Sequence, residues 1–474
     1  MLSPCQKSNT DMDIIMENKI MENKILDNKS FYKMAFSLIM PMAMQNLISV
    51  GINSIDVLML GSVSETVLSA ASLAGQVQFI MILIFFGLTS GAAVLTAQYW
   101  GKGDKSTIEK VMGICMRFSI IIGVFFTAAV LLFPAQIMRI FTNEAPVIAE
   151  GVKYLRIIAL SYIFMSITMI YLNVMRSVER VMVSTVVYLI SLIVNVTLAS
   201  MFILGAFGFP KLGITGAAIA TIAARAVELI CVIIYAKKFN KVIQFKFKNL
   251  FVRDKIIFKD FLRYSIPVTL NELMWGTGVA MNAVVIGHLG SSVVSANSVA
   301  QITRQLATVI AFGIANAAAI TIGKTIGENN MEAAKVYSKR FIKLSIAAGL
   351  AGALVILIVR PFLMSSLNLS ATTQGYLSIM MFVMSYFVVA QALNTTLIVG
   401  IFRGGGDTKF GLYLDVVTMW GGSILIGAIA AFIFHWSVPV VYIILMSDEI
   451  IKIPLSIWRF KSKKWLNNVT RDIV

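Results

Sequence analysis

Acidic residues inside long apolar stretches are the side chains of this chain best suited to carry chemistry. Asp56, Glu272 and Asp415 each lie within such a stretch. An ionisable group in a bilayer is costly, so its presence by default indicates an ion or substrate pathway. A carboxylate in that setting can bind a proton or a sodium ion, or attract a cationic ligand.

A hard cation needs several oxygen ligands, and Asp56 supplies only some of them. Amides and hydroxyls elsewhere in the first half of the chain can supply neutral oxygens. We therefore predict a proton or sodium site formed by Asp56, Asn173, Asn195, Thr215 and Thr221. The alternatives are that Asp56 caps polar groups near the membrane interface and that each neutral residue only bonds a neighbouring helix.

A second polar group is predicted around Glu272, which can carry a proton or face a cationic substrate. The alternatives are a carboxyl kept neutral by burial or paired with Arg304. Two further charged pairs, at i,i+3 and i,i+4 spacing, are interpreted as structural: Arg225 with Glu228, and Asp448 with Lys452. The predicted substrate or coupling residues are Gln45, Asn46, Asn271, Glu272, Trp275, Arg304 and Asp415.

The composition places these residues in a membrane. The chain has 474 residues, of which 58% are hydrophobic and 13% charged, whereas soluble domains are about 25% charged. The net charge of +17 is interpreted as basic loops on the cytosolic side and not as a nucleic-acid surface. Phosphate-loop, zinc-site and serine–histidine patterns do not appear in the sequence, so no enzymatic activity and no tightly held cofactor are expected.

Twelve runs are long and apolar enough to span a bilayer as helices. In a topology with a cytosolic N-terminus, 32 of the 40 basic residues fall in inner segments, so charge bias and span count agree on two cytosolic termini. The expected class is an all-α, multi-pass protein of the cell membrane. The predicted spans are 34–60, 73–98, 111–133, 155–175, 182–207, 213–236, 262–287, 294–323, 341–360, 376–400, 409–434 and 438–459.

The two halves of the chain repeat each other. Residues 41–101 align without a gap on residues 267–327, so that Pro41 meets Pro267 and Gly87 meets Gly313. Each half has six spans, an even number, so both enter the membrane in the same orientation. This predicts parallel repeats related by an axis along the membrane normal, with a substrate path between two six-helix bundles.

The domain plan follows from these spans. It comprises a cytosolic N-terminal tail, two bundles joined by a basic cytosolic linker, and a cytosolic C-terminal tail. The linker is expected to contain an interfacial helix near residues 250–262. The predicted bounds are 1–33, 34–236, 237–261, 262–459 and 460–474.

Several stretches resemble the multidrug and toxic compound extrusion (MATE) family. Pro41 precedes Asp56 by fifteen residues in the first span, residues 205–225 read GAFGFPKLGITGAAIATIAAR, and residues 403–408 read RGGGDT. The resemblance implies export of cationic or other amphipathic organic compounds, coupled to sodium ions or protons. We expect the chain to be monomeric, with small organic molecules and membrane lipid as its partners.

The chain departs from the family pattern at two positions. In some branches an acid follows the span-five asparagine by one turn, and Ala199 stands there. In others an acid follows the span-seven proline by two turns, and Trp275 stands there with Glu272 one turn earlier. A flippase for lipid-linked saccharides is the alternative function. It would require more cavity bases than the three seen within spans, Arg225, Arg304 and Lys452.

Overall fold

The computed structural model describes residues 27–244, 247–366 and 369–472, and within these all regular secondary structure is helical. The predicted N-terminal tail lies outside the described residues except for its last seven positions, of which Asp27 caps the first helix and the other six begin it. The helices are α2 (Asn28–Gly61), α3 (Glu65–Lys102), α4 (Lys105–Leu132), α5 (Pro134–Phe141), α6 (Ala145–Ser177), α7 (Val181–Leu204), α8 (Ile214–Ile234), α9 (Lys255–His288), α10 (Ser291–Gly327), α11 (Met331–Ser366), α12 (Ala371–Thr395), α13 (Lys409–Asp415), α14 (Leu425–Phe432), α15 (Val438–Leu445) and α16 (Asp448–Lys461).

Every predicted span corresponds to helix in the structure. Most helices extend beyond the predicted limits, because polar turns continue the helix past the apolar run. α12 continues through the π-helical segment η4 (Thr396–Phe402), and η5 (Val416–Ile424) joins α13 to α14 in one span. The twelfth span is broken into α15 and α16.

Ten helices of the described chain are long and apolar enough to cross a membrane. The two predicted spans outside that group are α9 and the α15–α16 pair. Both carry charged residues in their interior: Glu272 in α9, and Asp448, Glu449 and Lys452 in α16. Polar content therefore separates α9 from the other ten helices, whereas the twelfth span is also divided into helices of 8 and 14 residues, each too short to cross a bilayer alone.

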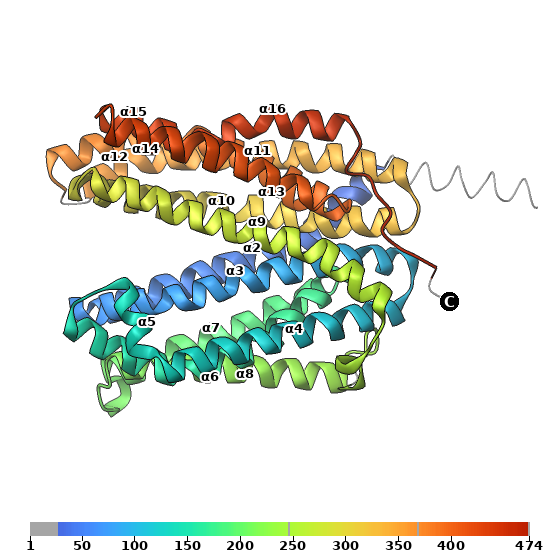
Figure 1. The fold of residues 1–474 in the computed structure, drawn as a ribbon, viewed down its shortest axis with the longest axis horizontal. Helices are drawn as coiled ribbons and strands as arrows, with labels where there is room; N and C mark the ends of the chain where they lie inside the picture. The colour runs from blue at the N-terminus through green and yellow to red at the C-terminus, as the bar shows by residue number, and fades with distance from the viewer. Residues whose placement is uncertain (1–26, 245–246, 367–368, 473–474) are drawn as a thin grey trace, which may run out of the picture.

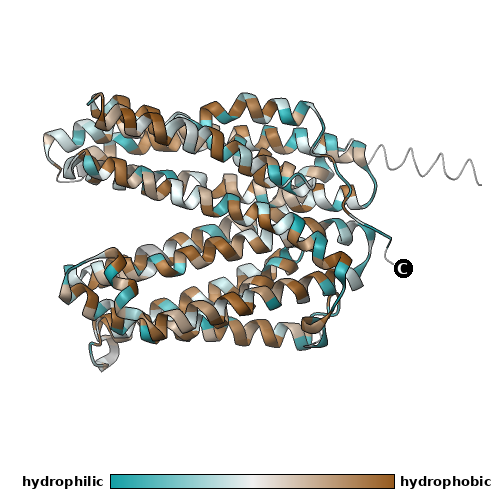
Figure 2. Ribbon diagram, in the orientation of Figure 1, coloured by the Kyte–Doolittle hydropathy of each residue, from teal (hydrophilic) through white to brown (hydrophobic). Residues whose placement is uncertain are grey.

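The helices form two bundles side by side (Figure 1). Helices α2 to α8 form one bundle and α9 to α16 the other. The described ends of the chain lie at the same end of the molecule, which we call the terminal face; the opposite end is the distal face. Apolar residues run along the helices, and hydrophilic residues concentrate at the ends and loops (Figure 2).

Glycines bring the bundles together in symmetric pairs. A methyl group at Gly87 of α3 would lie 2.3 Å from Cα of Thr269 in α9, and one at Gly313 of α10 would lie 3.3 Å from Cβ of Ala43 in α2. Both the glycines and their partners are separated by the 226 residues of the sequence repeat. The same holds at the terminal face, where methyl groups at Gly101 and Gly327 would each lie 1.9 Å from the carbonyl oxygens of Lys324 and Gln98.

A C-terminal tail (residues 462–472) fastens the terminal face across the two bundles. In Figure 1 the tail leaves α16 in dark red and crosses toward the other bundle. Asn467 N–H donates to Gly405 O (3.0 Å) in the second bundle. The Gln98 amide of α3 donates to Asn467 O (3.1 Å) and accepts from Val469 N–H (2.8 Å). The tail therefore bonds both bundles at once.

The linker differs from its prediction in one respect. No separate interfacial helix covers residues 250–262: a 3-10 turn (Phe247–Phe251) is followed by α9, which begins at Lys255 and continues through the predicted span. Asp254 sets that start, because its carboxylate accepts the N–H groups of Ile256 and Ile257 (both 3.1 Å). Hydrogen bonds from these amides and from Lys110 outweigh the effect of burial and lower the pKa of Asp254.

The glycine contacts predict how sensitive bundle packing is to one methyl group. Gly87→Ala forces a side chain into the α9 backbone, and we expect it to destabilise the closed packing by about 1 to 3 kcal/mol. Gly75→Ala in the same helix is the matched control, because a Cβ there meets nothing within 4 Å. Thermal unfolding in detergent should show a lower midpoint for Gly87→Ala only. Equal midpoints would contradict the packing described here.

Candidate functional site

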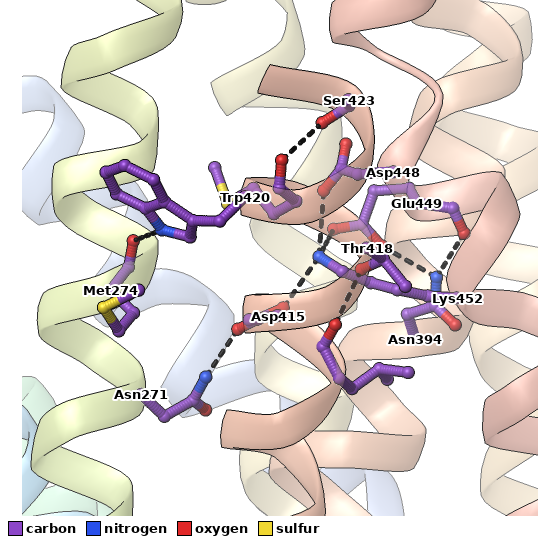
Figure 3. Close-up of polar contacts among 12 residues, drawn as sticks. Asn271, Met274, Asn394, Asp415, Thr418, Trp420, Ser423, Asp448, Glu449 and Lys452 are labelled. Atoms are coloured by element: carbon purple, nitrogen blue, oxygen red, sulfur yellow. Dashed lines mark hydrogen bonds and ion pairs between the residues drawn. The ribbon is translucent and has the colours of Figure 1, made fainter. Parts of the chain in front are cut away.

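A lysine surrounded by carboxylates lies in the interior of the second bundle. The ammonium group of Lys452 is 2.9 Å from Asp415, 2.9 Å from Asp448 and 3.4 Å from Glu449. Only 3% of its side chain is exposed. Asn394 donates to the Glu449 carboxylate (2.8 Å), which fixes that side chain from α12 (Figure 3).

A second ion pair continues the network toward the first bundle. Arg403 lies 2.7 Å from the Glu272 carboxylate and donates to Asn271 Oδ1 (2.8 Å) and to Ser90 Oγ of α3 (3.3 Å). Asn271 joins the two parts, because its amide donates to Asp415 (2.5 Å). One polar chain thus runs from Ser90 in the first bundle to Glu449 in the second. We call it the charge network: Glu272, Arg403, Asn271, Asp415, Lys452, Asp448, Glu449 and Asn394.

Local helix irregularities position these groups. Arg403 directly follows η4, and Asp415 directly precedes η5. π-Helical turns of this kind frequently occur at functional sites because they redirect side chains. The break between α15 and α16 puts Asp448 and Glu449 in the first turn of α16, where the helix dipole favours negative charge.

The charge network is unbalanced when all of its groups are ionised. It contains four carboxylates, Glu272, Asp415, Asp448 and Glu449, but only two cations, Arg403 and Lys452. Burying net charge in a membrane interior is strongly unfavourable. The network is therefore suited to take up protons or another cation, and its charge must change when it does so.

Arg304 adds a third cation next to the charge network without pairing directly to it. Its guanidinium donates to Gln301 (2.7 Å) and Gln391 (3.1 Å) and lies 5.9 Å from the centre of the Phe387 ring. It lies within electrostatic range of Asp448 and Glu449. Glu272 therefore pairs with Arg403, and the predicted alternative partner Arg304 is wrong.

A cavity of about 310 Å³, which we call the central cavity, lies between the bundles and reaches the charge network. Its first-bundle wall is largely aromatic and aliphatic, while its second-bundle wall carries the charges. A neighbouring cavity of about 210 Å³ in the second bundle shares Trp275 and is lined by Arg304. The first cavity is lined by Asn46, Phe79, Phe86, Asn271, Glu272, Trp275, Phe312, Gln391, Arg403, Asp415, Glu449 and Lys452, among others.

Asp56 lies apart from this cavity, in the first bundle. It is half-buried near the distal end of α2, and its charge interacts with Arg225 of α8 and with Tyr154 of α6. Arg225 in turn pairs with Glu228 (2.6 Å), as predicted from their spacing. Asp56 therefore faces a fixed positive charge that sequence reasoning had assigned only to a local pair.

The predicted neutral ligands of Asp56 lie in different places. Thr221 shares α8 with Arg225 and donates to the Ala217 carbonyl (3.0 Å), and Oδ1 of the buried Asn195 accepts no hydrogen bond among the described residues. Thr215 lies in the first turn of α8. These three stay in the distal half of the first bundle with Asp56, and their role as ligands stays a prediction.

Asn173 is not part of that group. It lies near the terminal end of α6 and lines a small cavity of about 50 Å³ with Met42 and Arg176. Asp56 follows Met42 by fourteen residues, about 21 Å along α2 at 1.5 Å per residue. Asp56 lies near the distal end of the first bundle and Asn173 near its terminal end, so the two side chains are too far apart to ligate one ion. The grouping of Asn173 with Asp56 is therefore wrong.

Gln45 also differs from its prediction as a substrate contact. It is 3% exposed, donates to the Thr185 hydroxyl (2.8 Å) and accepts from Arg176 (3.5 Å), so it is occupied within the first bundle. Its neighbour Asn46 does line the central cavity, and its Nδ2 makes no hydrogen bond among the described residues. Asn46 is the repeat counterpart of Glu272, so the two halves face the cavity with an amide and an acid.

Sequence reasoning missed Arg403, Glu449 and Asn394. Arg403 lies just beyond the predicted span 376–400 and so falls among the 32 basic residues assigned to inner segments, although its position at the end of an apolar run was a signal. Arg176 and Arg403 both line cavities, so the expectation of only three bases within the spans is wrong.

The described residues contain no cluster of three or more His, Cys, Asp or Glu side chains arranged to hold a metal ion. In the charge network, the ammonium of Lys452 lies where a metal ion would meet the three carboxylates. In the first bundle, Asp56 supplies one carboxylate and Asn195 one unpartnered amide oxygen, and Arg225 lies nearby. The donor set is therefore sparse for a hard cation, which prefers six or more oxygens.

Similar proteins support a transporter assignment. A probable multidrug resistance protein NorM of Rhizobium meliloti is 26% identical over 79% of this chain and 81% of its own length. The probable multidrug resistance protein YoeA of Bacillus subtilis is 25% identical over 72% of this chain and 74% of its own. A mutant of the Vibrio cholerae MATE transporter VcmN shares the fold with a TM-score of 0.84, at 16% identity over 93% of this chain and 98% of that one.

The MatE family model matches the chain twice, at residues 41–201 and 267–433. The two matches begin at Pro41 and Pro267, the positions where the internal repeat begins. They include the helices that surround the central cavity, α2, α3, α9 and α10, together with Arg403 and Asp415 of the charge network. The chain is a multi-pass membrane protein of the MatE family, the multidrug and toxic compound extrusion transporters.

Proposed function

We propose that the protein exports amphipathic or cationic organic compounds in exchange for protons, by alternating access between two bundles. The observation that carries this proposal is the buried charge network with its excess of carboxylates, which borders a cavity between two symmetry-related bundles. A site that must change charge and a cavity that touches it are the two parts that an antiporter needs.

The cavity chemistry supports an amphipathic substrate. Phe79 and Phe86 supply aromatic rings from the first bundle and Phe312 from the second, which also supplies the Glu272 carboxylate. Aromatic rings attract organic cations through their negative faces. Relatives named as multidrug resistance proteins support the same substrate class for this chain.

Fixed cations favour protons over sodium as the coupling ion. Lys452 lies among the carboxylates of the charge network, and Arg225 lies beside Asp56. A sodium ion at either place would be repelled by a neighbouring unit charge, which costs several kcal/mol at short range in a protein interior. A proton adds no separate ion, because it neutralises a carboxylate in place.

We assign the terminal face to the cytosol, because 32 of the 40 basic residues lie on that side of the predicted topology. The glycine pairs and the C-terminal tail close this face. In this arrangement the described state is closed to the cytosol, and protons entering from outside would reach Asp56 first, since it lies near the distal end of α2. Drug release and proton entry would then occur from the same side.

A lipid-linked saccharide flippase remains the second candidate. Its support is the pair Arg176 and Arg403, which line the cavity next to Asn173. That cavity has only about 50 Å³, which leaves no space for a pyrophosphate, and one of its two bases, Arg403, is already paired with Glu272. The antiporter is therefore the better supported function.

Replacing the first carboxylate should uncouple transport. Asp56→Asn keeps size but cannot exchange a proton, so we expect proton-driven efflux of tetraphenylphosphonium from proteoliposomes to fall by about tenfold or more. Glu65→Gln is the control, because Glu65 is an exposed acid near the same face. Normal efflux by Asp56→Asn at equal reconstitution would refute the role of this residue.

Removing the central ammonium should make stability depend on pH. Lys452→Met leaves Asp415, Asp448 and Glu449 without their cation, and breaking a buried pair typically costs about 3 to 5 kcal/mol. Protonated carboxyls no longer need the ammonium, so the loss should be large at pH 8 and small at pH 5.5. Thermal unfolding across pH measures this.

The controls for this variant separate protons from sodium. Lys461→Met changes an exposed lysine of the same helix and should leave the pH profile unchanged. If sodium at neutral pH restores Lys452→Met as well as acid does, the vacated position accepts sodium. That result would contradict the preference for protons.

Substrate and proton should weaken each other's binding. Each ligand can shift the equilibrium between states only by its differential affinity, and the coupling is reciprocal. We expect the Kd for tetraphenylphosphonium in detergent to rise by about fivefold or more from pH 8 to pH 5.5. Sodium should have little effect. An affinity unchanged by both ions would exclude direct coupling through these carboxylates.

A further inference from the structure

A polar pocket of about 690 Å³ lies at the terminal face of the second bundle. It is formed between the start of α9, the start of α13, the end of α16 and the C-terminal tail. Neither the charge network nor the proposed transport cycle uses it. Its lining includes Arg263, Tyr264, Asp407, Lys409, Tyr413, Arg459, Lys464, Asn468 and Arg471.

The pocket carries an excess of positive charge. Five basic side chains line it, and two of them are neutralised: Arg459 by Asp407 (2.7 Å) and Arg471 by Asp260 (2.7 Å). In the part of the chain that the structure describes, the other three, Arg263, Lys409 and Lys464, form no ion pair with a carboxylate. These come from three different elements, so the charges converge on one space.

An apolar surface continues from the pocket along the helices. On α9, Ile266 and Leu270 follow Arg263 at spacings of three and seven residues, on the same helix face, and both are exposed. On the other side, Tyr413 follows Lys409 by one turn, and Val417 continues beyond it; these two are 64% and 63% exposed. Each helix therefore presents a base at the terminal face and lipid-facing apolar side chains above it.

We propose that this pocket binds the phosphate headgroup of an anionic phospholipid, with the acyl chains lying along the exposed surfaces of α9 and α13. Basic pockets between spans on the cytosolic side are suited to anionic headgroups. A free phosphate ion would use the same three bases, but it would gain nothing from Ile266, Leu270, Tyr413 and Val417. The pairing of bases with a membrane-facing apolar surface favours the lipid.

The lipid would also strengthen closure of the terminal face. Lys464, Asn468 and Arg471 belong to the tail, so the complete pocket exists only while the tail is docked. The docked tail bonds Gln98 in one bundle and Gly405 in the other. A ligand that needs the docked tail must favour the docked state by its binding free energy. This consequence for transport rests on the proposed function; the binding itself does not.

Lipid binding can be measured on the purified full-length protein without any transport. Phosphatidylglycerol, phosphatidylcholine, diacylglycerol or inorganic phosphate is added to protein in neutral detergent, and retained lipid is counted by native mass spectrometry alongside thermal unfolding. We expect phosphatidylglycerol alone to be retained and to raise the unfolding midpoint. The test variant is Arg263→Gln/Lys409→Gln/Lys464→Gln, which should lose retention by about tenfold.

The control variant is Lys255→Gln/Lys259→Gln/Lys461→Gln. It removes the same charge from exposed residues of α9 and α16 at the same face, outside the pocket. Equal loss in both variants would overturn the proposal, because it would show only bulk attraction to basic loops. Equal protection by inorganic phosphate would also overturn it in favour of a soluble anion. Loss of efflux with lipid retention intact would instead count against the proposed function alone.

Discussion

The interaction on which the rest depends is the contact of Lys452 with three carboxylates inside a membrane-spanning bundle. Asp415, Asp448 and Glu449 come from two different spans, and their mutual repulsion in an apolar medium would separate them without the ammonium. With it, they still leave the charge network short of positive charge. That residual deficit favours uptake of a proton or another cation by the charge network.

The internal repeat duplicates packing but not charge. Gly87 against Thr269 and Gly313 against Ala43 are the same contact in both halves, as are Gly101 against Lys324 and Gly327 against Gln98. The polar positions diverge: Asn46 corresponds to Glu272, and Asp56 to Asn282. Gln98 and Lys324 are repeat counterparts but have different partners: Gln98 bonds the tail, and Lys324 pairs with Glu179 (2.9 Å). The scaffold is therefore symmetric, whereas the side chains that line the cavity and bond the tail are not.

Much of this fold follows from sequence because spans and repeats are local or periodic signals. Twelve apolar runs, the offset between Pro41 and Pro267, and the i,i+4 pair of Asp448 and Lys452 all reappear in the structure. The charge network does not follow in the same way, since it joins α9, α12, α13 and α16 through contacts that no spacing encodes. Asn173 was misplaced for the same reason: residue type suggests a ligand, but depth along each helix decides whether two ligands meet. Arg403 was missed because it lies at the end of a span. A base there satisfies the excess of positive charge on the cytosolic side whether it lies in a loop or pairs with a buried carboxylate.

The segment after Arg403 connects the charge network to the closed face. Arg403 holds Glu272, the next residue Gly404 accepts the Gln98 amide through its carbonyl (3.1 Å), and Gly405 accepts Asn467 of the tail. Methyl groups at Gly404 and Gly405 would lie 2.8 Å from Ala319 O and 2.1 Å from Trp465 O, so this segment has no room to move alone. Under the proposed exchange, a proton on Glu272 would remove the carboxylate that pairs with Arg403, and a shift of the backbone at Arg403 would displace the carbonyls that fasten α3 and the tail. The charge that borders the cavity and the closure of the terminal face therefore meet in adjacent residues of one backbone segment.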